Sequence, residues 1–102
     1  MSKDPQIAAI VKSVLELIKD ISPGKSVELR VPPYGAIQCV AGSNHRRGTP
    51  PNTVEMSGQT FIRLISEPAL WRSLCESGEV RASGLLSDLS NVLAQAAAKY
   101  RA

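Results

Sequence analysis

Aromatic side chains, histidine and cysteine are scarce in this sequence, and their scarcity limits the chemistry it can carry. Phe, Trp and Tyr make up 4% of the 102 residues, with one histidine and two cysteines. A surface of basic residues interleaved with stacking aromatics, typical of single-strand nucleic-acid binding, is therefore missing. One His and two Cys cannot complete a tetrahedral zinc site without a carboxylate, and no ligand spacing indicates one. We expect no nucleic-acid partner and no metal.

The motifs of common enzymes and cofactor sites are also absent. The sequence has no Gly-rich dinucleotide fingerprint, no phosphate-binding Gly-Lys-Ser/Thr loop and no Gly-x-Ser-x-Gly nucleophile elbow. His45 has no obvious orienting acid near it in the sequence, although a Ser–His–Asp arrangement brought together by the fold stays open. We expect a protein without a cofactor and without catalytic activity of its own.

Long apolar runs are missing too. No run approaches the ~20 residues of a membrane span, and no charged-then-apolar leader precedes a cleavage site. Cys39 and Cys75 are too few for a disulfide framework and fit small buried hydrophobes of a reducing compartment. We therefore expect one cytoplasmic domain over residues 1–102. The net charge of +3 and the pI near 9.1 favour anionic partners.

What the sequence does contain is regular hydrophobic spacing, which predicts elements in the order αβββααβα. Residues 4–21 place apolar side chains three and four apart, the stripe of an amphipathic helix that Asp4 caps. Residues 25–31 alternate, and residues 36–41 return as the second strand of a hairpin. The remaining elements are a strand over 53–56, a helix capped by Ser57 and reaching about residue 66, a helix from Pro68 to Gly78, a strand over 79–83 with Val80 and Ala82 inward, and a last helix capped by Ser87.

The connection 42–52 concentrates basic residues between two predicted strands, with His45 and the adjacent Arg46 and Arg47. Arginine offers a planar fork of donors that suits phosphate or carboxylate, and Gly48 lets backbone amides approach an anion. We interpret His45, Arg46 and Arg47 as a site for an anion or an acidic head group. The alternative is that an arginine pairs with a strand glutamate or a helix carbonyl and holds the loop down.

The apolar faces of the helices raise a separate question. Four helices supply more apolar surface than one face of a four-stranded sheet needs, so a cavity, the second sheet face or a partner must take up the rest. The simplest interpretation is that these side chains fill a core. The apolar pattern of the helices is compatible with a ligand pocket but does not require one.

Four segments, over residues 27–33, 36–40, 45–55 and 81–89, resemble the actinobacterial branch of the sterol carrier protein family. The Arg-Gly-Thr-Pro-Pro-Asn run ending at Asn52 is the most specific part. The resemblance implies an α/β (α+β) fold with a mainly antiparallel four-stranded sheet, helices packed on one face and an apolar tunnel for acyl chains or sterols. It also implies the strand order 3-2-1-4, with a right-handed crossover.

The function that we predict is non-catalytic binding of a lipid or another apolar or amphipathic ligand, with possible peripheral contact to an anionic membrane. Because the chain is shorter than typical members of the family, its tunnel could be small, open at one side or filled. The predicted lining is Val54, Met56, Phe61, Leu64, Ile65, Trp71, Leu74, Leu89 and Leu93.

Two other functions stay open. A module with a filled core could act through its exposed sheet or edge strand, docking to a partner or to itself as a homodimer. A related domain also forms the C-terminal part of mycothiol-dependent maleylpyruvate isomerase-like enzymes, so an accessory role to such an enzyme is the third hypothesis. Those enzymes carry their metal on a separate helical domain that this sequence does not contain.

Overall fold

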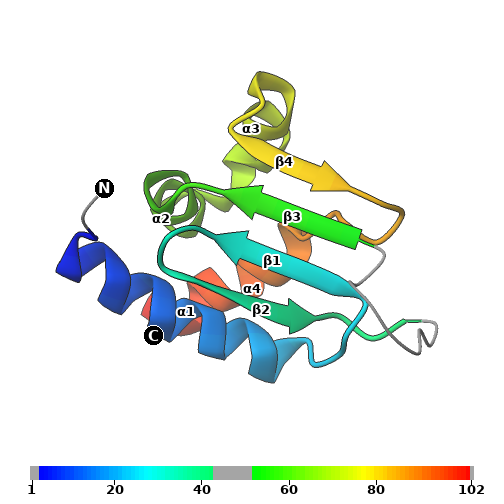
Figure 1. Cartoon of the computed structure of the whole chain (residues 1–102), viewed down its shortest axis with the longest axis horizontal. Helices are drawn as coiled ribbons and strands as arrows, with labels where there is room; N and C mark the ends of the chain where they lie inside the picture. Colours follow the sequence, from blue (N-terminus) through cyan, green and yellow to red (C-terminus); the bar gives the residue numbers. More distant parts are fainter. Residues whose placement is uncertain (1–2, 43–51, 102) are drawn as a thin grey trace.

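A computed structural model describes residues 3–42 and 52–101 of the chain (Figure 1). These residues form four α-helices, one short 3-10 helix and four strands, which confirms the predicted order αβββααβα. The elements are α1 (Pro5–Ile21), β1 (Val27–Val31), β2 (Gly35–Cys39), β3 (Asn52–Met56), α2 (Gly58–Ser66), η1 (Pro68–Leu70), α3 (Trp71–Ser77), β4 (Val80–Ser83) and α4 (Ser90–Arg101).

Local capping signals place most helix starts and ends where the sequence predicted them. The Asp4 carboxylate accepts a hydrogen bond from the Gln6 amide at 2.8 Å at the start of α1. The Ser57 hydroxyl accepts one from the Thr60 amide at 3.1 Å at the start of α2. Gly78 closes α3 in the left-handed region, with φ of 86°, which favours glycine. These contacts span a few residues, so the sequence predicts them well.

The start of α4 differs from the prediction. Ser87 does not cap this helix, because its hydroxyl donates to the Gly84 carbonyl at 2.7 Å and so closes a turn before the helix. The Asp88 carboxylate instead accepts from the Ser90 amide at 2.9 Å, and α4 begins at Ser90. A polar side chain near a helix start can bond either the helix or the preceding turn, and here the turn prevails.

The four strands form one mixed sheet in the order β2-β1-β3-β4. Strand β1 pairs antiparallel with β2 and parallel with β3, and β3 pairs antiparallel with β4. The mainly antiparallel sheet is therefore confirmed, whereas the predicted order 3-2-1-4 is wrong. The third strand, not the fourth, lies beside β1.

Hydrogen bonds at the end of the hairpin explain this order. Strand β2 ends beside the start of β1, where Cys39 pairs with Val27. There the Val40 amide donates to the Ser22 carbonyl at 2.7 Å and the Val40 carbonyl accepts from the Ser26 amide at 3.0 Å, which holds the chain after β2 against the start of β1. Strand β3 starts at the same end of the sheet, on the other side of β1, and runs parallel to it.

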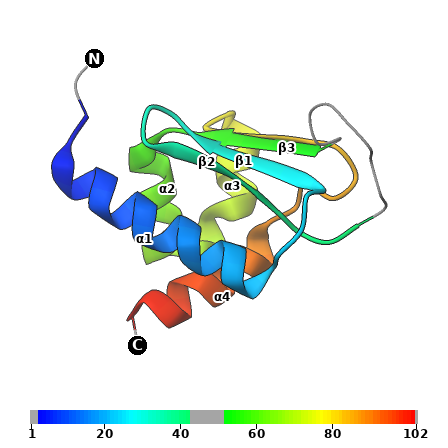
Figure 2. The same ribbon diagram turned by 60° about the horizontal axis from the view of Figure 1, so that its bottom comes forward.

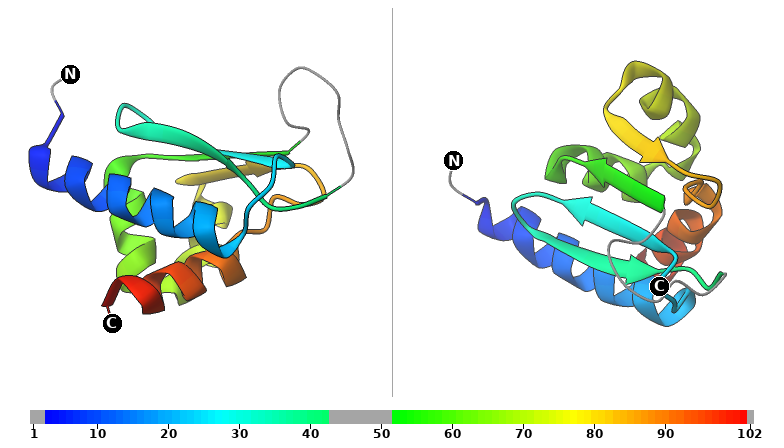
Figure 3. Two further views of the ribbon diagram at one scale, coloured as in Figure 1. Left: turned by 90° about the horizontal axis from the view of Figure 1, so that it is seen from below. Right: turned by 45° about the vertical axis from the view of Figure 1, so that its right-hand side comes forward.

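All the helices lie on one face of the sheet (Figures 2 and 3). Helix α1 packs against β2, whereas α4 packs mainly against α1, α2 and η1 and forms an outer layer below them. Helix-on-helix packing therefore takes up much of the apolar surface that one sheet face could not cover. At the far edge of the sheet, Val80 pairs with Met56 and Ala82 with Val54, so both face the helix side as predicted, although only Val80 is buried there.

Candidate functional site

The residues predicted to line a ligand pocket come together between the sheet and the helices. Val54 and Met56 of β3 and Leu74 of α3 are buried in the same apolar cluster. Trp71 is half-buried and packs against the same cluster from the start of α3. The fully buried members of the predicted set are Val54, Met56, Phe61, Leu64, Ile65, Leu74, Leu89 and Leu93. Their side chains occupy the interior in this structure.

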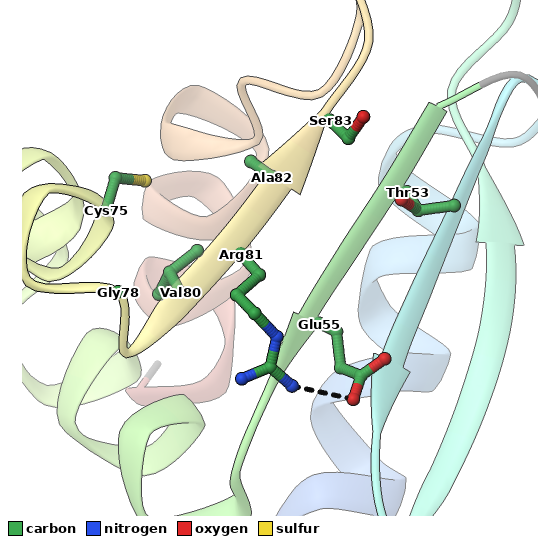
Figure 4. Close-up of a pocket in the computed structure, with 8 residues that line it drawn as sticks. All are labelled: Thr53, Glu55, Cys75, Gly78, Val80, Arg81, Ala82 and Ser83. Atoms are coloured by element: carbon green, nitrogen blue, oxygen red, sulfur yellow. Dashed lines mark hydrogen bonds and ion pairs between the residues drawn. The ribbon is translucent and has the colours of Figure 1, made fainter.

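Open surface pockets formed by the described residues involve few of these side chains. A pocket of about 390 Å³ includes Met56, and another of about 560 Å³ includes Trp71. A third, of about 460 Å³, lies against β3 and β4 (Figure 4). The other seven residues of the predicted lining border none of these three pockets.

Helix α3 buries the fewest residues of the four α-helices. Leu74 is its only buried residue, and the helix packs mainly against β4 and the 3-10 turn. Cys75 borders both the pocket beside β4 and the pocket beside Trp71, so hollows lie on two sides of this helix. By contrast, α4 is tied down by Arg101, whose guanidinium donates to the carbonyls of Ile65 and Ser66.

The opposite face of the sheet carries a row of paired charges that crosses three strands. On β1, the Arg30 guanidinium donates to the Glu28 carboxylate at 2.7 Å and lies 3.7 Å from the carboxylate of Glu55 on β3. Arg81 of β4 donates to the same Glu55 carboxylate at 2.8 Å, as Figure 4 shows. The ion pair with Glu28 raises the pKa of Arg30 further, so this arginine is a permanent cation. Two acids and two bases balance one another on this face.

The two thiols are poor nucleophiles. Burial on the helix side of β2 raises the pKa of Cys39 to about 11. Burial, together with the acidic groups of Asp88 and Glu76, also raises the pKa of Cys75. Reactive cysteines need the opposite shift, because the thiolate is the attacking species. No three metal-ligating side chains gather among residues 3–42 and 52–101.

The predicted anion-binding residues His45, Arg46 and Arg47 lie outside the described residues. The residues that flank this segment lie at one end of the sheet, because Gly42 approaches Ser26 and Asn52 pairs with Val27 at the start of β1. Two strand glutamates, Glu28 and Glu55, bond Arg30 and Arg81.

Three features of the structure were not predicted from the sequence. The alternation of β1 and β3 was a sufficient signal for the charged row, because it places Arg30 and Glu55 on the same face. No local sequence pattern indicated that the Asn52 side chain would be buried and would bridge two loops. The exposed pair Leu85 and Leu86 was visible as two adjacent leucines after a glycine.

A mixed four-stranded sheet, with helices stacked on one face and paired charges on the other, defines the class of fold. The family described as "Bacterial SCP ortholog" matches residues 3–94, and the chain belongs to this family of sterol carrier protein type. A solved structure titled "UbiJ-SCP2 Ubiquinone synthesis protein" covers 100% of this chain and 98% of its own, with 18% identity and a TM-score of 0.54. At that identity the likeness shows the fold.

Comparison with curated protein sequences gave no match. The family match does not identify the actinobacterial branch, so membership of that branch stays a prediction. Among the helices of residues 3–42 and 52–101, none has both the length and the apolar character to cross a bilayer.

Proposed function

We propose that this protein binds a lipid or another apolar or amphipathic ligand between its sheet and its helices, without catalysis. Family membership supports this function. The observation that carries it is the division of the sheet into two faces. Every large apolar side chain of β1 and β3 points toward the helices, while the other face carries charged residues that pair with one another. Only the helix side of the sheet is therefore compatible with an apolar ligand.

The ligand would bind in the region that the core side chains now fill. Protein interiors are close-packed, so a ligand enters such a site only when an element moves aside. Helix α3 requires the least disruption, since it buries only Leu74 and is flanked by hollows. We place the entrance at α3, on the side where Trp71 borders a pocket, with Phe61, Leu64, Ile65, Leu89 and Leu93 deeper inside.

The acidic group of an amphipathic ligand would lie at the end of the sheet, where His45, Arg46 and Arg47 are predicted to supply cations. The net charge of +3 supports an anionic group over a cationic one.

Palmitate titration tests the interior site directly. Trp71 is the only tryptophan, so a saturable change of its fluorescence would report a ligand at α3. Leu74→Trp should weaken palmitate binding, measured by native mass spectrometry, because the larger ring fills the entrance. Ser73→Trp adds the same ring to an exposed position of α3 and should leave binding intact. A wild-type protein that binds neither palmitate nor a sterol would refute the proposal.

A second candidate is an interaction module, and the filled interior favours it. In that case the sheet face without helices would meet a partner or a second copy. Leu74→Trp would then overpack the core and cost ~1–3 kcal/mol of stability, with no ligand whose binding could change. Native mass spectrometry separates the two functions, since a carrier retains lipid and an interaction module gives a ligand-free dimer or complex.

A further inference from the structure

The turn between β4 and α4 presents two adjacent leucines to solvent. The side chain of Leu85 is 102% exposed and that of Leu86 is 41% exposed. Of the described residues, the other exposed large apolar side chain is Tyr100, which lies on α4. Single exposed apolar residues are ordinary on protein surfaces, but an adjacent pair at the tip of a turn is less so.

Buried polar contacts hold this turn in place. Asn52 is 4% exposed, and its side-chain amide donates to the Ser26 carbonyl at 2.8 Å. The oxygen of the same side chain accepts from the Leu86 amide at 2.9 Å, which ties the turn to the start of β1. Gly84 has φ of 108°, and a Cβ there would collide with the Asn52 oxygen, so only glycine fits. The backbone of the turn is therefore held in place, and little backbone entropy is lost when the leucine pair binds.

Among the described residues, the three segments that meet around the leucine pair contain no acid. A Cβ at Gly42 would lie 3.0 Å from Leu86 Cδ1, so the chain after β2 borders the turn. The segments 22–26, 40–42 and 83–87, which meet at this end of the sheet, carry one charged residue, Lys25. Asp88 follows the turn, but its carboxylate accepts from the Ser90 amide and borders the pocket beside Trp71.

We propose that Leu85 and Leu86 insert into the interface of a lipid bilayer and orient this end of the molecule toward the membrane. Two leucines offer far less area than the roughly 1,200–2,000 Å² of a stable protein interface, whereas a bilayer can receive one or two side chains. The absence of acids near the tip favours a neutral or anionic lipid surface. This contact is independent of the interior ligand.

Flotation with vesicles of phosphatidylcholine, with and without phosphatidylglycerol, tests the membrane contact. Leu85→Ser should weaken partitioning about tenfold on both vesicles, because one fully exposed leucine loses its burial. Tyr100→Ser, a matched change of an exposed apolar residue on α4, should leave partitioning unchanged. Both variants should melt like the wild type, since neither side chain is buried.

Leu85→Trp provides a measurement that depends on insertion itself. This variant should keep its vesicle binding, and its emission should shift to shorter wavelength with vesicles by more than that of the wild type. Palmitate binding by Leu85→Ser should equal that of the wild type, so failure of the membrane contact and failure of the interior site are distinguishable. A wild type that ignores both vesicles, a Leu85→Ser variant that partitions normally, or a self-association that Leu85→Ser abolishes without any vesicle binding would each overturn the proposal.

Discussion

The two faces of the sheet differ although neighbouring residues of the same strands build them. On the helix side, Leu29, Val54 and Met56 are fully buried. One residue along, Arg30 and Glu55 project from the opposite side and pair across the sheet. Hydrophobic burial contributes roughly 25 cal/mol per Å², whereas exposed ion pairs contribute about 0–1 kcal/mol. We therefore expect one face to determine stability and the other to keep the sheet compatible with water.

This contrast also limits where a ligand can bind. The charged side chains of the open face neutralise one another, because consecutive ion pairs join Glu28, Arg30, Glu55 and Arg81. Their mutual pairing leaves little unbalanced charge to attract a partner. The helix side holds the apolar residues, but it is filled. Function on that side requires motion, and function on the open side requires that the ion pairs be exchanged for contacts with a partner.

The largest effect should come from the helix side. Phe61→Ala should lower the free energy of unfolding by ~3–5 kcal/mol, because it removes a fully buried ring and leaves a cavity. Urea denaturation at neutral pH measures the loss, and Phe61→Leu, which keeps most of the volume, should lose less. A much smaller loss for Phe61→Ala would mean that the interior is loosely packed, as expected around a ligand tunnel.

A change on the open face should have a smaller effect. Glu55→Gln removes the acid that joins Arg30 and Arg81, yet all three side chains are partly exposed. We expect a loss of at most about 1 kcal/mol at low salt, shrinking as the salt concentration rises. Glu16→Gln, which breaks the exposed Glu16–Lys19 pair of α1, is the control and should behave similarly. A loss as large as that of Phe61→Ala would show that a partner or second copy shields this face.

The smallest effect concerns Asp88 at the start of α4. Hydrogen bonds from the Ser90 hydroxyl and amide lower the pKa of this carboxyl. Its contribution is therefore present above the ordinary Asp pKa of about 4 and is lost as the pH falls through the lowered value. Asp88→Asn should be slightly less stable than the wild type at pH 7, by less than Glu55→Gln, because solvent screens the exposed carboxylate.

Thermal melts at neutral and strongly acidic pH measure this difference, which should vanish in acid. Ser90→Ala, which removes the hydroxyl donor, should reproduce part of the loss at pH 7. If the difference between wild type and Asp88→Asn persisted in acid, the carboxylate charge would not be its cause.

The elements were predictable because short-range contacts set them. Alternation in β1 placed Val27, Leu29 and Val31 on the buried side, and Asp4 and Ser57 capped the helices as expected. Ser87 was misassigned because a turn and a helix start compete for the same hydroxyl. The apolar residues predicted to line the site lie in or against one buried cluster, but periodicity does not report whether such a cluster is filled or hollow.

The sequence by itself determined the order of the elements, the apolar side of each and the family resemblance, since all three follow from residues close together in the chain. Only the tertiary structure decided the strand order, the outer position of α4 and the presentation of Leu85. Each of these depends on contacts between distant residues, such as the bond from the Leu86 amide to Asn52, 34 positions away. Such contacts form only when two separate segments already lie side by side, so no local pattern in either segment predicts them.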